Sequence, residues 1–487
     1  MKNIKLRMSG HAYDQFKEHL FPGDGLEAVA FALCGYLETE LELVYTAHSV
    51  YLYPHDQCTV REGDRVEWSP AEIVDLFESS RKKGLRLLKI HSHPEYWPYF
   101  SKVDDRSDIE LADTVSGWVG KNESICSVIL LPDGSMIGRS IDHNGNFTKL
   151  TSILVISENI SCFYDKDANE DKETTLAIQD DLHLRTKQAF GEGTTSILQK
   201  LRIGVVGCSG TGSIVAEQLA RLCVGSLVLV DHDKVETKNV NRILNSKILH
   251  AQDEVYKVDM MKQAIESIGI DVQVQAIAAD LHSMDAYMAI ASCDIVFGCM
   301  DTVDGRHLLN RISTYFCSAY FDIGVRLDAD GKGGINEIQG RVDYIQPGLS
   351  SLLTRERYTL DQLKEADLAR TNPDEHERQI NEGYIKSANV GSPAVISVNM
   401  MFSSMAVTEL LARLHPFKDR GNENYAAITF SVSGFMLIAE REAKVDEELS
   451  TKVGLGHKHP ILDAPMLVTP SIKASYEFQR SNSQALS

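Results

Sequence analysis

The sequence lacks the cysteine pairs on which several kinds of fold depend. None of its nine cysteines belongs to a Cys-x-x-Cys pair, and the number of cysteines is odd. Disulfide frameworks and cysteine-ligated zinc sites both need paired cysteines, so this pattern favours reduced thiols. The last cysteine is Cys317, which leaves the final third of the chain without a thiol.

Clustered positive charge is also missing. The net charge is −20, and the basic residues form no concentrated stripe. A nucleic-acid groove needs such a stripe to displace counterions from phosphates, so we expect no nucleic-acid partner. No stretch approaches the roughly 18 consecutive apolar residues of a membrane-spanning helix, and the opening MKNIKLRMSGHAYDQF has no apolar signal core. We expect a cytoplasmic protein with no membrane partner.

The chain of 487 residues is too long for a single core, because domains usually hold about 100–200 residues. From Leu26 to about residue 145, short β-rich runs alternate with helical segments such as residues 69–84, where Ser69 is a candidate helix cap. This alternation predicts an α/β or α+β domain, which we place at residues 1–155.

A different pattern begins after an acidic segment that we assign as a linker, residues 156–181. The runs RIGVVG, SIVAEQLARLCVG and SLVLVDHD predict strand, helix and strand, and such apolar strands are typical of a parallel sheet covered on both faces. Further strands are predicted at VQVQAIAAD, DIVFGCMD and AYFDIGVR, a buried helix at 391–415 and closing strands at 425–441. We expect a Rossmann-like, doubly wound domain at 182–445 and a polar, partly disordered tail at 446–487.

The stretch LKIHSHPEYWPYFSKVDD contains a candidate metal site. Side chains alternate along a strand, so His91 and His93 point to the same side and can share one ion. Asp104 offers a third ligand and leaves the fourth position of a tetrahedral zinc open for water, as in catalytic sites. Zinc lowers the pKa of such a water to about 7, and Glu27 is our candidate general base. A His-x-His pair alone is more often simply exposed on a strand.

The complete spacing is more specific than the histidine pair. His-Ser-His-Pro, followed by Ser101 and Asp104, resembles the signature of the JAMM/MPN (JAB-type) zinc metalloproteases. These enzymes cleave peptide or isopeptide bonds at the C-terminus of ubiquitin-like proteins. The resemblance covers about residues 5–145 and implies that His91, His93 and Asp104 bind zinc and that Glu27 activates water. Ser101 would hydrogen-bond the oxyanion of the tetrahedral intermediate.

Two features beside this motif leave alternatives open. Asp105 and Asp108 are also near, but the spacing favours Asp104 as the ligand, and we expect the other two to be surface charges. The aromatic run EYWPYF between Pro94 and Ser101 either packs locally or lines a channel for an extended peptide tail. Packing is the more common fate of such residues.

A second candidate site lies in RIGVVGCSGTGSIVAEQLA. Glycines between a strand and a helix let phosphate approach the helix N-terminus. The dinucleotide fingerprint is G-x-G-x-x-G, whereas Gly207, Gly210 and Gly212 give G-x-x-G-x-G, with Ser209 where a glycine is needed. The spacing therefore argues against NAD.

The following strand ends in VDHDKVETKNVNR, and together the two stretches resemble the ThiF/MoeB and ubiquitin-activating superfamily over about residues 182–440. That family uses MgATP to adenylate the C-terminal glycine of a ubiquitin-like or sulfur-carrier protein. The resemblance implies a set of ATP- and magnesium-binding residues, which are Gly207, Gly210, Gly212, Asp231, Asp233, Asn239, Arg242, Lys257 and Asp301.

The expected roles follow from charge. Asp231 accepts hydrogen bonds from the ribose hydroxyls, Asn239, Arg242 and Lys257 neutralise the triphosphate, and Asp301 holds Mg²⁺. Two further residues need separate mention. Lys262 is an alternative to Lys257, which we favour for its distance from Arg242. Arg185 resembles an arginine that such enzymes insert into a partner subunit's nucleotide site, which implies a homodimer.

Departures from the family pattern narrow these expectations. Many relatives carry two C-x-x-C pairs for a structural zinc, but the region YIQPGLSSLLTRERY has none, so we expect no zinc in this half. Relatives that form a thioester use a cysteine after the adenylation core. Cys208, Cys299 and Cys317 are better explained as small buried hydrophobic residues. A thioester on this chain is therefore not expected, and a separate conjugating enzyme or thiol would receive the adenylate.

These inferences combine into a bifunctional enzyme. One half would hydrolyse a bond at a ubiquitin-like C-terminus with Zn²⁺, and the other would adenylate the exposed glycine with ATP and Mg²⁺, as in bacterial ubiquitin-like conjugation operons. Two alternatives stay open. The chain could activate a sulfur carrier for cofactor or cysteine synthesis, or one half could be an inactive scaffold that holds the carrier.

Overall fold

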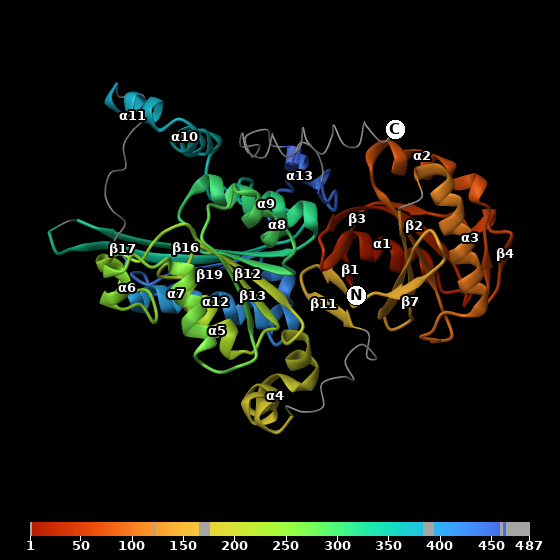
Figure 1. The fold of residues 1–487 in the computed structure, drawn as a ribbon, viewed down its shortest axis with the longest axis horizontal. Coiled ribbons are helices and arrows are strands. Elements are labelled where there is room, and N and C mark those ends of the chain that lie inside the picture. The colour runs from red at the N-terminus through yellow and green to blue at the C-terminus, as the bar shows by residue number, and fades with distance from the viewer. Residues whose placement is uncertain are drawn as a thin grey trace. The chain divides into compact units, whose positions relative to one another are not determined.

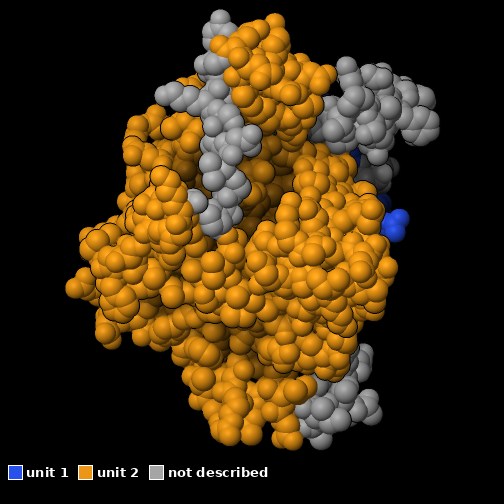
Figure 2. Space-filling view, turned by 90° about the vertical axis from the view of Figure 1, so that its left-hand side faces the viewer, with its two compact units in different colours: residues 1–176, 314–317, 448–458 blue, residues 177–313, 318–447, 459–487 orange. Residues whose placement is uncertain are grey.

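The computed structural model describes residues 2–120, 123–164, 176–330, 332–382, 394–457 and 461–463. The chain divides into two compact units. Unit 1 comprises residues 1–176, 314–317 and 448–458, and unit 2 comprises residues 177–313, 318–447 and 459–487. Most of the surface visible in Figure 2 belongs to unit 2. Within the described ranges, no helix combines the length and apolar character that crossing a bilayer requires.

Unit 1 is built on a nine-stranded mixed sheet in the order β11-β10-β1-β3-β2-β6-β7-β8-β9 (Figure 1). A separate hairpin joins β4 to β5, and the helices α1, α2 and α3 lie between strands along the chain. The elements are β1 (Asn3–Ser9), α1 (Gly10–Leu20), β2 (Val29–Glu38), β3 (Glu42–Leu52), β4 (Val60–Arg61), β5 (Val66–Glu67), α2 (Val74–Lys83), β6 (Arg86–Ser92), α3 (Lys102–Val119), β7 (Ile125–Leu130), β8 (Met136–Ile141), β9 (Phe147–Lys149), β10 (Ser152–Ile156) and β11 (Ile160–Tyr164).

Strand β6 separates the core of unit 1 from its candidate site. All its residues are buried, and alternation sends them to two faces of the sheet. Leu88 and Ile90 join the hydrophobic core, whereas Lys89 contacts α3 on the other face, through Ser107 and Asp108. The antiparallel partner β2 places Val29 opposite His91. This register brings the segment before β2, which carries Glu27, to the end of β6.

Part of the predicted C-terminal tail packs within unit 1. Gly454 accepts hydrogen bonds from the backbone of Gly35 (3.0 Å) and the hydroxyl of Thr46 (2.9 Å). Its φ is +70°, and an added Cβ would lie 2.0 Å from the carbonyl oxygen of Ala47, so only glycine fits. Residues 448–457 of the predicted tail are therefore ordered, and residues 464–487 lie outside the described part of the chain.

Unit 2 is built on an eight-stranded sheet in the order β14-β13-β12-β15-β16-β17-β18-β19, parallel from β14 to β16 and antiparallel from β16 onward. The elements that follow β11 along the chain are α4 (Leu176–Leu198), β12 (Arg202–Val206), α5 (Gly212–Arg221), β13 (Ser226–Val230), α6 (Ile248–Gln252), α7 (Lys257–Glu266), β14 (Gln273–Ile277), α8 (Met284–Ala291), β15 (Ile295–Gly298), α9 (Val303–Phe316), β16 (Ala319–Ala329), β17 (Ile335–Ile345), α10 (Leu360–Thr371), α11 (Pro373–Asn381), α12 (Ile396–Leu414), β18 (Ala427–Ser431), β19 (Met436–Glu440) and α13 (Glu447–Ser450), of which α13 lies mostly in unit 1.

The doubly wound sheet predicted for the second half is confirmed. Helices α8 and α9 cover one face, and α5, α7 and α12 cover the other (Figure 1). The buried helix predicted at 391–415 is α12, although residues 391–393 lie outside the described chain. The segment assigned as a linker, 156–181, is partly structured, since β11 ends at Tyr164 and α4 begins at Leu176.

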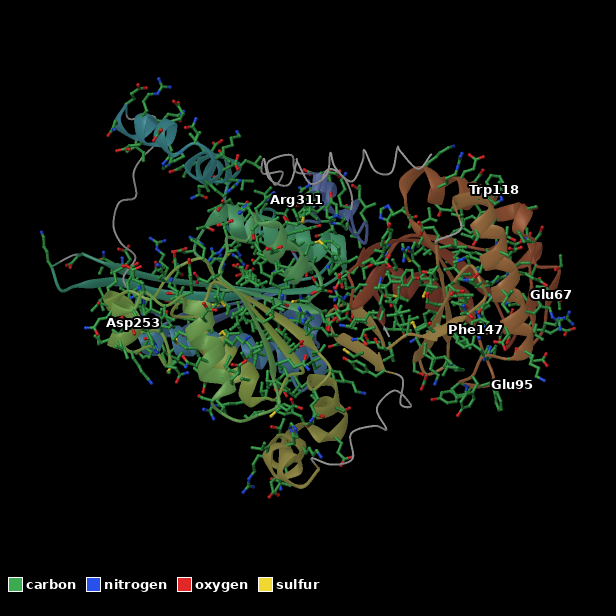
Figure 3. The ribbon with its side chains drawn as sticks, in the orientation of Figure 1. Glu67, Glu95, Trp118, Phe147, Asp253 and Arg311 are labelled. Carbon is green, nitrogen blue, oxygen red and sulfur yellow. The ribbon has the colours of Figure 1, made fainter. Side chains whose placement is uncertain are left out.

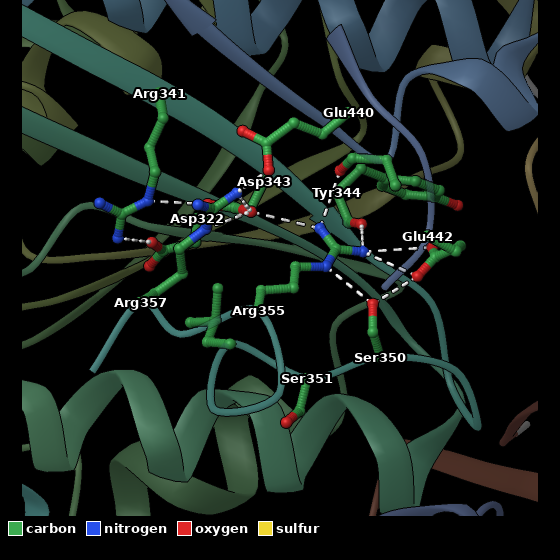
Figure 4. A network of polar contacts seen from close by, with 12 residues as sticks. Asp322, Arg341, Asp343, Tyr344, Ser350, Ser351, Arg355, Arg357, Glu440 and Glu442 are labelled. Carbon is green, nitrogen blue, oxygen red and sulfur yellow. Dashed lines mark hydrogen bonds and ion pairs between the residues drawn. The ribbon is translucent and has the colours of Figure 1, made fainter. Parts of the chain in front are cut away.

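A buried ionic network closes the antiparallel side of the unit 2 sheet (Figure 4). Arg355 donates to Ser350 Oγ (2.8 Å), to Asp343 Oδ1 (3.3 Å) and to both oxygens of Glu442 (3.1 Å each). It also donates to two backbone carbonyls, so its guanidinium is fully used. Asp343 is completely buried. Arg355 therefore ties the loop after β17 to the strand itself and to the segment after β19.

We expect Arg355→Ala to destabilise the protein by about 3–5 kcal/mol, because removing one partner of a buried ion pair leaves the other charges uncompensated. Urea unfolding followed by circular dichroism measures the change. The control is Arg326→Ala, since Arg326 is exposed and lies 3.6 Å from Asp328, a kind of pair worth about 0–1 kcal/mol. Equal effects of the two substitutions would contradict the importance of the network.

Candidate functional sites

The three predicted metal ligands of unit 1 lie together. His91 Nε2 is 3.1 Å from His93 Nε2 and 3.1 Å from Asp104 Oδ1, and His93 Nε2 is 3.7 Å from Asp104 Oδ2. Both histidines are buried, and Asp104 is 9% exposed. Glu27 Oε1 lies 3.7 Å from His93 Nε2. The four residues predicted from the motif and its surroundings therefore form one cluster.

Local backbone contacts fix two of these side chains. Ser101 caps α3, because its hydroxyl accepts the N–H of Asp104 (3.2 Å) while its own N–H donates to Asp104 Oδ2 (2.7 Å). His93 Nδ1 lies 2.7 Å from the carbonyl of Trp97, which makes it the donor and leaves Nε2 as an acceptor. Asp104 Oδ1 and His93 Nε2 are thus free to face His91.

The cluster fits a divalent metal ion. Two nitrogens bound to one zinc at 2.0–2.1 Å with a tetrahedral angle lie roughly 3.3 Å apart, close to the observed separation of the histidine nitrogens. His93 Nε2, His91 Nε2 and Asp104 Oδ1 therefore converge on one point of a buried site, as the ligand atoms of one ion do. Burial raises the pKa of Asp104, but the hydrogen bonds from His91 and Ser101 and the charge of His91 outweigh burial and hold the pKa well below its usual range. The donor set of two imidazoles and one carboxylate suits zinc.

Glu27 differs from Asp104 in the direction of its pKa shift. Burial, together with the nearby charge of Asp104, raises the pKa of Glu27 to about 8. Its backbone is held by Glu62, whose carbonyl accepts the N–H of Glu27 (2.7 Å), and by Arg61, which donates to its carbonyl (3.1 Å). A carboxylate with a raised pKa near the operating pH is suited to taking up and releasing a proton.

The prediction that Asp108 is a surface charge is wrong. Asp108 is completely buried and accepts hydrogen bonds from Lys89 (2.7 Å), Ser127 (3.1 Å) and both Nε and Nη2 of Arg139. Asp105 is partly exposed and pairs with Arg139 as well. Asp108 lies one helical turn after Asp104 on α3. Its ion pairs with Lys89 and Arg139 therefore hold the turn that carries Asp104 against the sheet.

The aromatic run, for which local packing and the lining of a channel are both open, contains three largely exposed rings. Tyr96, Trp97 and Tyr99 are 51%, 59% and 62% exposed. Phe100 alone of the rings packs inward, 6.4 Å from the ring of His91 and stacked against the guanidinium of Arg139. The loop between His93 and Ser101 therefore presents aromatic rings to solvent.

The second site lies at the carboxyl ends of the parallel strands of unit 2, where ligands bind in open α/β sheets. The glycine loop joins β12 to α5. Gly207 has φ +87°, and a Cβ there would lie 2.8 Å from the carbonyl oxygen of Cys299. A Cβ on Gly212 would lie 1.8 Å from the carbonyl oxygen of Gly207, so the loop cannot close with a larger residue.

Three charged residues meet beside this loop. Asp231 accepts the N–H of Cys208 (2.7 Å) and of Asp233 (2.8 Å). Lys257 is buried at the start of α7, 2.6 Å from Asp233 Oδ2 and 3.9 Å from Asp231 Oδ1. Burial raises the pKa of Asp231, whereas for Asp233 the hydrogen bond and charge of Lys257 outweigh burial and lower it. Asp231, His232 and Asp233 have possible metal-ligand atoms within 4.8 Å of one another. The positive charge beside the two aspartates is, however, already provided by the ammonium group of Lys257.

The alternative lysine, Lys262, is half-buried and lies 3.8 Å from Glu266, a residue of its own helix. Asn239 is buried, and its side chain accepts the N–H of Glu236 (3.0 Å), which fixes the turn after β13. Arg242 lies near the loop: a Cβ on Gly210 would be 3.5 Å from its Cδ.

Asp301 is exposed and follows Cys299 by two residues. The carbonyl of Cys299 accepts a hydrogen bond from the hydroxyl of Thr211 in the glycine loop (3.4 Å). This places Asp301 beside the loop. Arg185 is exposed on α4, where it donates to Gln188 (3.1 Å). The structure therefore gathers the predicted residues at one edge of the sheet, except for Arg185, whose predicted role requires a second subunit.

Sequence reasoning missed Asn399 of α12. It is buried, and a Cβ on Gly210 would lie 2.2 Å from its side-chain nitrogen. The signal was present, because a buried asparagine within the apolar stretch ISVNMMF needs a polar neighbour. The three cysteines predicted to be buried are so: Cys208, Cys299 and Cys317 are at most 9% exposed. Burial raises the pKa of each thiol, in Cys299 to about 12.

Comparison with known proteins identifies relatives of unit 2. The ubiquitin-like modifier-activating enzyme 5 of Bombyx mori is 27% identical over 165 residues, which are 32% of this chain and 39% of that protein. The same-named enzyme of Caenorhabditis elegans is 27% identical over 162 residues, 31% of this chain and 36% of that protein. The chain thus spans about two fifths of the length of these relatives.

Partial matches also occur among solved structures. The E. coli protein MccB, solved with ATP, has a TM-score of 0.42 and 14% identity, and the alignment covers 55% of this chain and 73% of MccB. The model of the ThiF family matches residues 182–448, which is more than half of the chain and includes every residue of the cluster at the edge of the unit 2 sheet. The chain belongs to the ThiF family.

Proposed function

We propose that this protein is a bifunctional enzyme of a ubiquitin-like carrier protein. Unit 1 would be a JAMM/MPN-type zinc peptidase that hydrolyses the peptide or isopeptide bond beyond the C-terminal glycine of the carrier. Unit 2 would adenylate that glycine with ATP and Mg²⁺. The observation that carries the first half is the cluster of His91, His93 and Asp104 with Glu27 beside it. Family membership and the glycine loop carry the second.

In the proposed hydrolysis, bound zinc would act as a Lewis acid and lower the pKa of a water. The chain's own residues have separate tasks. His91, His93 and Asp104 would hold the ion, and the Trp97 carbonyl keeps His93 Nε2 free for it. Glu27 Oε would take a proton from the attacking water and pass it to the leaving amine. The Ser101 hydroxyl, whose oxygen already accepts from Asp104 N–H, can donate its proton to the developing oxyanion.

In the proposed adenylation, the glycine loop would receive phosphate at the N-terminus of α5. Asp231, held by two backbone N–H groups, would accept hydrogen bonds from the ribose. Lys257 would turn from Asp233 toward the phosphates, and Arg242 would share that charge. Asp301 would hold Mg²⁺ as an oxygen ligand. The carrier carboxylate then attacks the α-phosphate, and pyrophosphate leaves. Arg185 would act in a homodimer, in the partner's site.

We expect the wild-type protein to bind one zinc ion and His91→Ala to lose it. Loss of a direct ligand should weaken binding by more than the 10–100-fold typical of outer-shell changes. Elemental analysis after dialysis against trace zinc measures the stoichiometry. His143→Ala is the control, since His143 is exposed on a turn. Equal zinc contents in the two variants would exclude the proposed site.

We expect the stability of the zinc-free protein to fall as pH rises from about 5 to 9. The folded protein holds the Glu27 proton up to its pKa of about 8, whereas the unfolded chain releases it near 4.5, so rising pH favours unfolding. Glu27→Gln removes this penalty, which is at most about 5 kcal/mol at high pH. Thermal unfolding should show Glu27→Gln above wild type at pH 9 and level with it at pH 5.

The control for that measurement is Glu40→Gln, because Glu40 is exposed and has no comparable environment. A difference between wild type and Glu27→Gln that stays constant with pH would show that Glu27 has no raised pKa. Excess zinc is expected to reduce the difference, since a cation beside Glu27 favours its ionised form.

We expect carrier-dependent ATP–pyrophosphate exchange that requires Asp301. Asp301→Ala should lower the exchange rate by about 100-fold or more, because Asp301 would hold the ion that neutralises the phosphates. Asp271→Ala, at an exposed position, should leave the rate unchanged. The assay uses ubiquitin-like proteins with the natural tail and trimmed to the terminal glycine. Glu27→Ala should block exchange only with untrimmed carriers.

The trimmed carriers separate the two activities. No exchange with any trimmed carrier, despite bound ATP, would overturn the adenylation proposal. Exchange with untrimmed carriers that persists in Glu27→Ala would overturn the proposed order of hydrolysis before adenylation.

A further inference from the structure

Two pairs of side chains join strand β6 to helix α3 in unit 1. His91 Nε2 lies 3.1 Å from Asp104 Oδ1, and Lys89 Nζ lies 2.7 Å from Asp108 Oδ1. Both residues of the second pair are buried. The first pair belongs to the proposed metal cluster, whereas the proposed hydrolysis gives the second pair, Lys89 and Asp108, no task.

The two pairs have matching spacings on the strand and on the helix. Residues i and i+2 of a strand share a face and lie about 6.7 Å apart, and residues i and i+4 of a helix share a face and lie about 6 Å apart. Lys89 and His91 are related in the first way, and Asp108 and Asp104 in the second. Because the two spacings agree, contact at the Lys89–Asp108 pair brings α3 within contact distance of β6 at the other pair.

The capping box at the start of α3 does not set this distance. Ser101 accepts the N–H of Asp104 (3.2 Å), and the N–H of Ser101 donates to the Asp104 carboxylate (2.7 Å). Both bonds lie at the N-terminus of the helix, so they orient the carboxylate relative to α3 alone. The separation of α3 from β6 needs a contact that joins the two elements, and the Lys89–Asp108 pair is such a contact.

The Lys89–Asp108 pair is itself anchored to two further strands. Asp108 accepts hydrogen bonds from Ser127 on β7 (3.1 Å) and from Nε and Nη2 of Arg139 on β8 (3.0 and 2.7 Å). The ring centroid of Phe147, a residue labelled in Figure 3, lies 4.0 Å from the guanidinium carbon of Arg139. A carboxylate with partners on three neighbouring strands has little freedom to move across the sheet.

The charges of this network balance one another. Lys89 and Arg139 are cations, Asp108 pairs with both of them, and Asp105 pairs with Arg139 as well. Two positive and two negative charges lie together, so the network can hold the helix in place without repelling a divalent cation nearby.

We propose that the Lys89–Asp108 pair positions Asp104 at ligand distance from His91 whether or not a metal ion is bound. The site is formed before zinc binds and stays formed after zinc leaves, so metal exchange does not loosen α3. Lys89 and Asp108 act through Asp104 and are positioning residues. This inference rests on the proposed zinc site and adds to it how the loading of that site with metal is controlled.

The first test is the zinc affinity of Lys89→Met, measured on the full chain by competition with a chromophoric chelator. Methionine fills the volume of the lysine stem, and Asp108 keeps its bonds from Ser127 and Arg139, so we expect the variant to fold. The dissociation constant should rise about 10-fold to 100-fold, the range for outer-shell partners of metal ligands. Only the zinc that His91→Ala loses is counted, because that zinc belongs to the cluster.

The sign of the change distinguishes positioning from charge. The charge of Lys89 acts on Glu27 and His93, so its removal alone would tighten the binding of a cation. Loss of positioning weakens that binding instead. Lys89→Arg keeps the charge and a donor for Asp108, and it should recover part of the affinity. Tighter or unchanged zinc binding in Lys89→Met would overturn the proposal.

The matched control is Lys82→Met. Lys82 is exposed on α2 and pairs with Glu78 (2.8 Å), so this substitution removes the same charge from the same unit without touching α3 or β6. The zinc affinity should stay that of wild type. An equal loss of affinity in Lys82→Met and Lys89→Met would contradict a specific role of the buried pair.

The second test is amide hydrogen exchange of residues 102–110, followed by mass spectrometry with and without zinc. In wild type these amides should be protected without zinc nearly as well as with it. In Lys89→Met the protection should be lost without zinc and return with it. Protection that appears in wild type only when zinc is added would overturn the proposal.

Failure of the inference and failure of the proposed function give different results. If wild type binds zinc through His91 and Lys89→Met binds it equally tightly, the positioning role falls and the proposed zinc site stands. If wild type binds no zinc that depends on His91, the proposed zinc site falls, and the inference that rests on it falls too.

Discussion

A backbone N–H group holds the central carboxylate of each candidate site. Asp104 receives one from Ser101, and Asp231 receives two, from Cys208 and Asp233. Hydrogen bonds to charged groups contribute about 1.5–3 kcal/mol each, so they fix a carboxylate where burial would otherwise favour its neutral form. The balance differs between the sites. At Asp104 the hydrogen bonds and the charge of His91 outweigh burial, so the pKa is lowered. At Asp231 burial outweighs the hydrogen bonds and the charge of Lys257, so the pKa is raised.

The metal cluster could be predicted from sequence because each of its constraints is local. Period-two alternation puts His91 and His93 on one side of a strand, and Ser-x-x-Asp is the spacing of a helix-capping box, which Ser101 and Asp104 form. The role of Asp108 could not be predicted in this way. Its partners, Lys89 and Arg139, come from β6 and β8, so only the folded sheet shows that the charge is buried.

In unit 2, too, the local contacts could be predicted from the sequence and the long-range contacts could not. The strand–loop–helix pattern and its glycines predict a phosphate-binding loop, since the close contacts of Gly207 and Gly212 arise within one turn or at the neighbouring strand. Asn399 approaches that loop from a helix nearly two hundred residues later, and Arg355 gathers partners from β17, the loop after it and the segment after β19. A guanidinium with five donors can join three segments in this way, where a single ion pair joins two. No sequence period encodes such contacts.

The chemistry of the two proposed reactions sets their order. Hydrolysis of an amide beyond the terminal glycine yields a carboxylate on the tail and a free amine on the leaving segment. Adenylation consumes that carboxylate, because its oxygen attacks the α-phosphate and displaces pyrophosphate. A tail that still carries the amide has no nucleophile for ATP, and a tail that carries a carboxylate has no bond left for the peptidase. In this proposal the two sites would recognise mutually exclusive states of one tail and would not compete for the same form of the carrier.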